Sequence, residues 1–242
     1  MKRAFVISQE DYEDLSHNVF VSLTLIMLLL FAVFYSQIGG ESIDVTYFVI
    51  NITFNLVATF VQCALIAEGK EKNTLRGLML SPASTLDILL GKSALTFVTT
   101  LVLIAACAFI MGYNPAKLLV ILLALIVSTF FYIEIGTILR LMTKTVMEAS
   151  LIVIPAFFFF SFSPMLLVYE DRFSIIGLLD YLPNIVLIDL AHQIEASAGL
   201  GSAWVELVIL SAWALVMFVC MGGTCDSVCL GARYVRRKYC DV

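Results

Sequence analysis

Six apolar runs, each long enough to cross a lipid bilayer, constrain this chain more than any other feature of its sequence. A transmembrane helix needs about 20 consecutive apolar residues. The runs cover residues 19–38, 45–67, 94–113, 118–141, 149–169 and 204–223. Of the 242 residues, 61% are hydrophobic and 14% are charged, against about 45–50% and 25% in soluble domains. We expect an all-α integral membrane protein, with a single transmembrane domain over residues 1–242.

The basic residues predict how these helices are oriented. With both termini on the cytoplasmic side, twelve of the 14 Lys and Arg residues fall in cytoplasmic segments, and only Lys117 and Arg172 fall outside. Short loops with this bias set the topology of a membrane protein. We therefore expect six transmembrane helices with both termini cytoplasmic. A compact chain of this kind suits a bacterial plasma membrane, where it spans the bilayer several times.

The second apolar run carries a line of polar side chains. Asn51, Asn55, Thr59 and Gln62 recur at intervals of four, four and three residues, so they share one face of a helix. Amide groups that face lipid cost free energy. This face therefore points either at other helices, where it forms hydrogen bonds that hold the packing, or at a translocation path.

The fifth run contains Pro155 and Pro164, which we expect to break or kink its helix. Phenylalanines fill the space between the prolines, and Phe158 and Phe162 either pack and face lipid or form an aromatic wall for an apolar cargo. The connection that follows is too apolar for a solvated loop. It predicts two short amphipathic helices, split at residues 182–184, that dip into the outer leaflet or cap the bundle.

Catalysis by this chain is not expected, and no catalytic residue is assigned. Its sequence contains neither the H-E-x-x-H pattern of metalloproteases nor the G-x-S-x-G pattern of hydrolases. The Gly-Lys-Ser triplet at residues 91–93 lacks the second glycine of a phosphate-binding loop, because position 86 is leucine. We expect no cofactor, no metal site and no nucleic-acid partner.

Glu134 is a carboxylate inside the fourth run, six residues before Arg140. Such a group is a functional candidate, since a charge is costly in the bilayer. It either reaches the inner surface or pairs with a basic group there, or it couples proton movement to transport. Proton coupling by Glu134 would make the chain an ion-coupled secondary transporter.

The loop between the second and third runs changes from polar to apolar along its length. Leu75, Leu78 and Met79 lie on one side of a short helix, and Ser81-Pro82 ends that helix. The stretch EGKEKNTLRGLMLSPASTLDILLGKSAL closely resembles the signature loop of ABC-2 type transporter permeases. The matching positions are Glu68, Glu71, Thr74, Leu75, Leu78, Ser81, Pro82, Ser84, Ile88, Leu89, Gly91 and Lys92.

The resemblance implies the transmembrane subunit of an ATP-driven exporter. By that resemblance, two permease chains, expected to be a homodimer, work with two copies of a separate ATP-binding subunit that holds ATP and Mg²⁺. The loop helix over residues 73–80 would couple the two kinds of subunit. Gly91 and Lys92 would form the hinge into the third span, with Lys92 at the level of the lipid headgroups.

The charges outside the membrane suggest the class of cargo. Acidic residues outnumber basic ones in the outer segments. Together with the phenylalanine-rich fifth run, this favours a hydrophobic or amphipathic cargo such as a cationic antimicrobial peptide or a drug, over a lipid or a polysaccharide. The alternative is the ion-coupled secondary transporter that uses Glu134.

Overall fold

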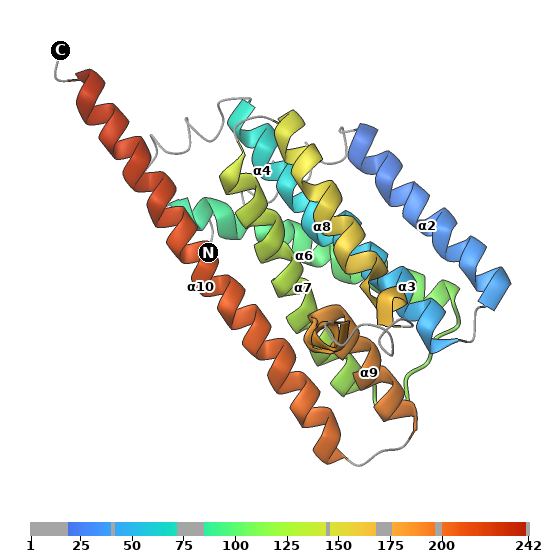
Figure 1. The fold of residues 1–242 in the computed structure, drawn as a ribbon. Helices are drawn as coiled ribbons and strands as arrows, with labels where there is room; N and C mark the ends of the chain where they lie inside the picture. The colour runs from blue at the N-terminus through green and yellow to red at the C-terminus, as the bar shows by residue number, and fades with distance from the viewer. Residues whose placement is uncertain are drawn as a thin grey trace.

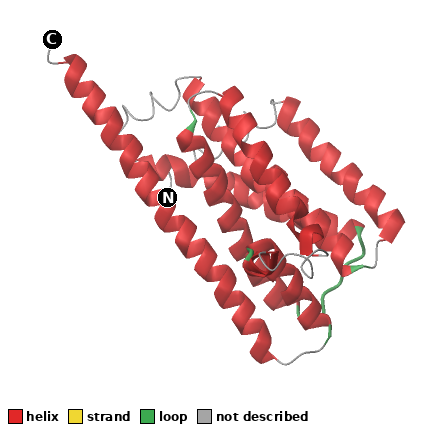
Figure 2. Cartoon of the chain, viewed as in Figure 1, coloured by secondary structure: helices red, strands yellow, loops and turns green. Residues whose placement is uncertain are grey.

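The computed structural model describes residues 19–39, 42–71, 85–143, 146–167, 176–196 and 200–240, and every regular element in this part is helical (Figures 1 and 2). Five helical stretches are long and apolar enough to cross a bilayer. They are Ser22–Gly39, Ile43–Ile66, Gly91–Ile110, Leu118–Met142 and Ala203–Thr224. Each lies within a few residues of an expected run, so the structure has the expected all-helical, multi-pass character.

The helices follow one another along the chain with short connections. The long single helices are α2 (Val19–Gly39), α6 (Thr85–Ile110), α7 (Leu118–Met142), α8 (Val146–Leu166) and α10 (Leu200–Cys240). The second stretch is composite and runs without a break through α3 (Ile43–Thr53), the π-helix η1 (Phe54–Val61) and α4 (Gln62–Glu71). The connection from α8 to α10 contains the 3₁₀ helix η3 (Ile176–Tyr181) and α9 (Pro183–Glu195).

The composite helix α3–η1–α4 is the centre of the bundle. Of its membrane-length stretch 83% is buried, against 11% of the corresponding stretches of α2 and α10. It contacts α2, α6, α7 and α8, which surround it (Figure 1). The second run is also the one with the polar line at Asn51, Asn55, Thr59 and Gln62, and its central place keeps those side chains away from lipid.

Helix α8 continues through both of its prolines, so of the expected break or kink the break was wrong. Pro164 has no N–H to donate to the carbonyl of Phe160, four residues earlier. The side chain of Asn184 on α9 replaces that donor: its Nδ2 lies 2.8 Å from the Phe160 carbonyl oxygen and 2.6 Å from Ser163 Oγ. A neighbouring side chain can sustain a helix through a proline in this way. The apolar part of α8, Leu151–Leu166, is shorter than the five long stretches.

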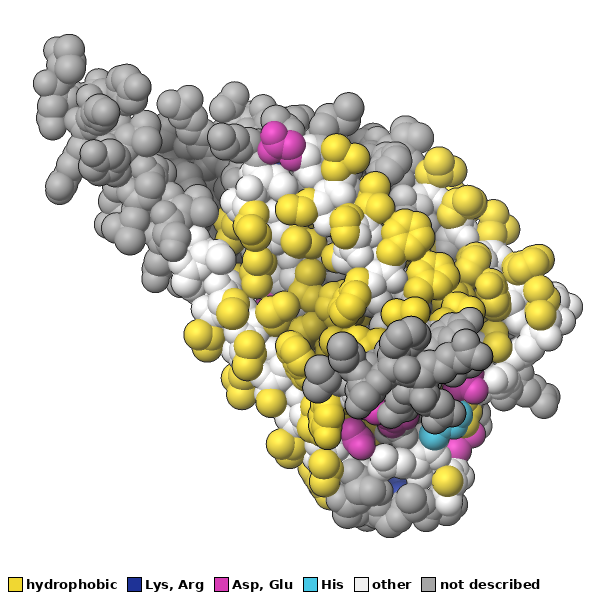
Figure 3. Space-filling model, in the orientation of Figure 1, with side chains coloured by type: hydrophobic (Ala, Val, Ile, Leu, Met, Phe, Trp, Pro, Cys, Tyr) yellow, Lys and Arg dark blue, Asp and Glu magenta, His cyan; other side chains and the backbone are white. Residues whose placement is uncertain are grey.

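Helix α9 closes one end of the bundle. Its apolar residues are buried against α10, α7 and α3, and they are Ile185, Val186, Leu187, Leu190, Ala191 and Ile194. The helix therefore caps the bundle, which is one of the two arrangements expected for this connection. Figure 3 shows hydrophobic side chains spread over much of the described part of the visible face, while most of the acidic side chains in view and a histidine gather towards its lower end.

Candidate functional site

The polar line of the central helix faces the other helices of the same chain. Asn51, Asn55, Thr59 and Gln62 are all at most 1% exposed. Asn55 Nδ2 donates to Ser161 Oγ of α8 at 3.3 Å, and Thr59 Oγ1 donates to the carbonyl of Tyr132 in α7 at 3.2 Å. These are the interhelical hydrogen bonds of the packing alternative, and they fix the register of α7 and α8 on the central helix.

Gln62 joins three helices at once. Its Nε2 donates to Ser93 Oγ of α6 at 2.9 Å and to Thr137 Oγ1 of α7 at 3.2 Å, while Thr96 Oγ1 of α6 donates to its Oε1 at 2.6 Å. All three hydrogen-bond partners of the Gln62 amide lie inside the bundle. A satisfied buried amide of this kind specifies one arrangement of its neighbours.

The π-helix η1 is the place where α7 comes closest to the central helix. A Cβ atom added at Gly136 of α7 would lie 2.5 Å from the carbonyl oxygen of Thr59 and 3.1 Å from its Cα. One turn away, the rings of Phe54 and Tyr132 stack with their centroids 4.9 Å apart. A π-helix is rare and often marks a functional site. At the wider turn, the backbone of α7 lies against the backbone of η1. Only glycine at position 136 leaves room for this contact.

The two predicted phenylalanines of α8 lie at its surface. Phe158 is 55% exposed and Phe162 is 38% exposed, and their rings stack with centroids 5.7 Å apart. Phe158 also lines a crevice of about 380 Å³ together with Asn55 and with Thr24 of α2. The structure therefore brings one residue of the polar line and one of the aromatic wall to the same crevice, while the other polar-line residues do not line it.

The residues predicted to couple to an ATPase divide into three groups. Glu68 and Glu71 lie in the last turns of α4. Thr74, Leu75, Leu78, Met79, Ser81 and Pro82 lie outside the described residues. Gly91 and Lys92 lie inside the continuous helix α6, which begins at Thr85, and Lys92 is only 5% exposed. Both residues thus lie within α6 rather than before it, and their predicted roles as a hinge and as an anchor at the level of the lipid headgroups stay predictions.

Glu134 lies between α7 and α10. Its side chain is 8% exposed, and it lines a small cavity of about 240 Å³ with Phe130 of α7 and with Ser211 and Leu215 of α10. Among the described residues it makes no ion pair, and its Oε2 has no hydrogen-bond partner. The expected pairing with a basic group is therefore not found within this part of the chain.

A third and larger cavity lies beside α9, and the sequence contains no separate signal for it. Its volume is about 540 Å³. We call it the α9 cavity. Its lining residues are Tyr35, Asp44, Val45, Phe48, Pro164, Met165, Leu167, Ile185, Ile188, Asp189 and His192. They come from the end of α2, the first turns of α3, the end of α8 and one face of α9.

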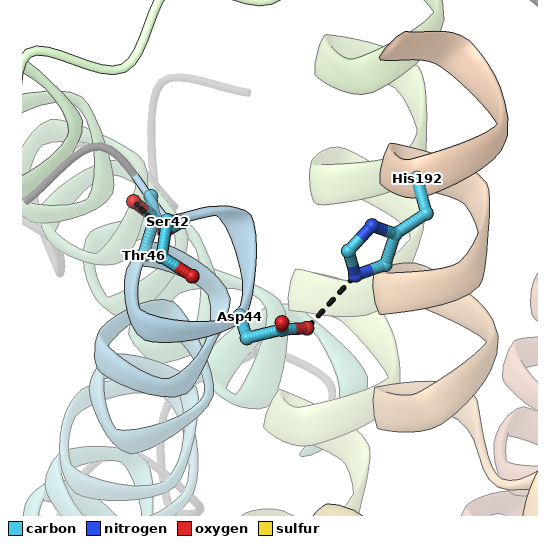
Figure 4. A network of polar contacts seen from close by, with 4 residues as sticks. All are labelled: Ser42, Asp44, Thr46 and His192. Carbon is cyan, nitrogen blue, oxygen red and sulfur yellow. Dashed lines mark hydrogen bonds and ion pairs between the residues drawn. The ribbon is translucent and has the colours of Figure 1, made fainter. Parts of the chain in front are cut away.

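Asp44 and His192 join α3 to α9 at the rim of this cavity. Figure 4 shows Asp44 extending from the first turn of α3 towards the imidazole of His192, and His192 Nε2 lies 2.8 Å from Asp44 Oδ1. An ionised carboxylate only accepts hydrogen bonds, so Nε2 is the donor. Both side chains remain partly exposed to solvent, at 45% for His192 and 71% for Asp44.

Asp189 is the second carboxylate of the α9 cavity. It precedes His192 by three residues, so the two side chains share one face of α9. Partial desolvation raises the pKa of Asp189, the carboxylates of Glu206 and Asp180 raise it further, and His192 lowers it. Asp189 therefore becomes neutral at a higher pH than an ordinary aspartate, because partial burial and then the neighbouring carboxylates disfavour its charged form.

No model of a known protein family matches this chain, and none of the curated proteins is significantly similar to it in sequence.

Proposed function

We propose that this chain is the transmembrane permease subunit of an ATP-driven exporter of the ABC-2 type. The observation that carries the proposal is the connection between α8 and α10. It folds into η3 and α9 and packs across the end of the bundle. The resemblance of residues 68–95 to the family's signature loop implies a folded connection of this kind between the last two spans.

In this proposal the chain crosses the bilayer six times, with α8 as the fifth crossing, and both termini are cytoplasmic. The α9 end is then the outer end. Two permease chains, expected to be identical, assemble with two copies of an ATP-binding subunit, which holds the ATP and Mg²⁺. The cargo is a hydrophobic or amphipathic molecule, and an antimicrobial peptide or drug with positive charge is favoured by the acidic side chains at the α9 end. A bacterial plasma membrane is the expected location.

Purification of the tagged chain from the membranes of its own host tests the proposal directly. In gentle detergent, we expect a soluble ATPase to copurify at about the permease's own stoichiometry and the preparation to hydrolyse ATP. A stable permease without a partner and without ATP hydrolysis would contradict the exporter proposal.

Replacing Leu78 with aspartate is expected to uncouple transport from ATP hydrolysis while the permease remains in the membrane. The reason is that an added charge on the apolar side of the loop helix would disturb its contact with the ATPase, and coupling requires such a differential contact. The measurement is ATP-driven transport in vesicles that contain both subunits. Gln9→Asp adds the same charge in the N-terminal segment, outside the loop helix, and is the matched control. Equal transport by Leu78→Asp and Gln9→Asp would overturn the coupling assignment.

The ion-coupled transporter is the second candidate, and Glu134 is the observation that favours it. A buried carboxylate with an unpartnered oxygen, lining a cavity inside a span, is typical of proton-coupled sites. If this candidate is correct, Glu134→Gln should abolish transport driven by a pH gradient in vesicles without any ATPase. Glu148→Gln, at an exposed carboxylate of α8, serves as control. Transport that depends on ATP and survives Glu134→Gln would exclude the ion-coupled mechanism.

A further inference from the structure

The α9 cavity has the size and the walls of a site for a small amphiphile. Its volume of about 540 Å³ falls within the range of about 300–1,000 Å³ that is typical of pockets for drug-sized ligands. Most of its wall is apolar, and the residues that form this part are Val45, Phe48, Pro164, Met165, Leu167, Ile185 and Ile188. An apolar wall with a few polar groups at one side both holds and orients a ligand.

The polar groups of the cavity select for positive charge. Asp44 and Asp189 line the cavity, and none of the described residues that line it is a lysine or an arginine. His192 brings the two carboxylates together, since it contacts Asp44 directly and shares a helix face with Asp189. The charge of the site is therefore complementary to a cation and repels an anion.

Two aromatic rings in the wall add to this preference. The ring centroids of Tyr35 and Phe48 are 5.7 Å apart, and both residues line the cavity. The face of an aromatic ring attracts a cation that lies within about 6 Å of it. The site thus offers a cation both carboxylates and aromatic faces without requiring a hydrogen-bond donor on the ligand.

We propose that the α9 cavity binds amphiphilic cations, with the apolar body against Ile185 and Ile188 and the positive charge beside Asp44 and Asp189. The inference deepens the proposed function and rests on it only for the statement that the bound cation is cargo. Binding itself requires no ATPase, so it can be measured on the permease alone.

Acidification should weaken this binding. As the pH falls through the raised pKa of Asp189, that carboxyl becomes neutral and no longer attracts the cation. The other charged groups that face Asp189 are Glu206 on α10, Asp180 on η3 and His192 on α9. Because the pKa of Asp189 is raised, its negative charge is lost as the pH falls, and affinity for the cation rises with pH.

The decisive probe is tetraphenylphosphonium, a lipophilic cation, compared with tetraphenylborate, an anion of the same shape. Saturable binding to the permease in phosphatidylcholine nanodiscs is measured after subtraction of the signal from empty nanodiscs. We expect binding of the cation and no saturable binding of the anion. The double variant Asp44→Asn, Asp189→Asn should bind the cation about tenfold more weakly. Affinity for the cation in the original chain should fall as the medium is acidified through the raised pKa of Asp189.

Glu195→Gln is the matched control, because it removes one negative charge from α9 at an exposed residue that does not line the cavity. Thermal unfolding of each variant shows whether it has kept its fold. Equal affinity of the double variant and of Glu195→Gln, or saturable binding of tetraphenylborate, would overturn the proposal. Such a result would not change whether an ATPase copurifies with the permease. The cation-binding proposal and the exporter proposal can therefore fail separately.

Discussion

A Gly136→Ala variant is expected to lose about 3 kcal/mol of folding stability and to yield little monodisperse protein. The new Cβ would lie 2.5 Å from the backbone carbonyl oxygen of Thr59 in η1. Overpacking in a tightly packed core typically costs about 1–3 kcal/mol. We expect the upper end of this range because the atom that the new Cβ meets belongs to the backbone. In addition, stacking of Phe54 on Tyr132 holds the surrounding side chains in place.

The measurement is the thermal unfolding of the detergent-solubilised chain, together with the fraction that elutes as a single species. Gly222→Ala on α10 is the matched control, since a Cβ at that position meets nothing within 4 Å. Alanine also favours a helix over glycine by about 1 kcal/mol. The control should therefore be as stable as the original chain or slightly more so. Equal stability of the two variants would mean that α7 does not lie against η1 as described.

The positions of the membrane helices could be predicted from the sequence because length and apolarity together decide them. A run of about 20 apolar residues has no other stable place than a bilayer or a protein core. The five long stretches accordingly lie within a few residues of expected runs. The central place of the second stretch was also foreseeable in part, since amides at Asn51, Asn55 and Gln62 require partners other than lipid.

The details of packing could not be predicted in the same way. The local sequence of residues 54–61 does not predict a π-helix. We attribute the wider turn to packing against α7 rather than to the helix propensity of these residues. The continuity of α8 depends on Asn184, a residue 20 positions after Pro164. The burial of Lys92 likewise follows from the arrangement of its neighbours. Each of these features arises where distant segments meet.

The α9 cavity illustrates the same limit for the candidate site. The excess of acidic residues in the outer segments was visible in the sequence, and it suggested a cationic cargo. The sequence did not indicate that Asp44 and Asp189 line one cavity, since one begins α3 and the other lies in α9.

Replacing Asn184 with leucine is expected to lower the free energy of unfolding by about 1 kcal/mol, the typical net contribution of one hydrogen bond, because a buried carbonyl then keeps only the longer 3.4 Å bond from Ser163 Oγ. The carbonyl is that of Phe160, and Pro164 has no N–H to donate to it. Combining the change with Pro164→Ala should reduce the loss, because alanine supplies the missing N–H within the helix. The interaction energy between the two sites is measured by a double-mutant cycle on thermal or denaturant unfolding.

Pro155→Ala is the matched control for this cycle. It also adds an N–H to α8, but its acceptor would be the carbonyl of Leu151, which Asn184 does not contact. The loss caused by Asn184→Leu should therefore be unchanged in the Pro155→Ala background and smaller in the Pro164→Ala background. Such a difference would assign the stabilising role of Asn184 to one carbonyl and explain why α9 is tied to α8. If both backgrounds gave the same loss, Asn184 would act through packing or through Ser163 alone, and the continuity of α8 would need another cause.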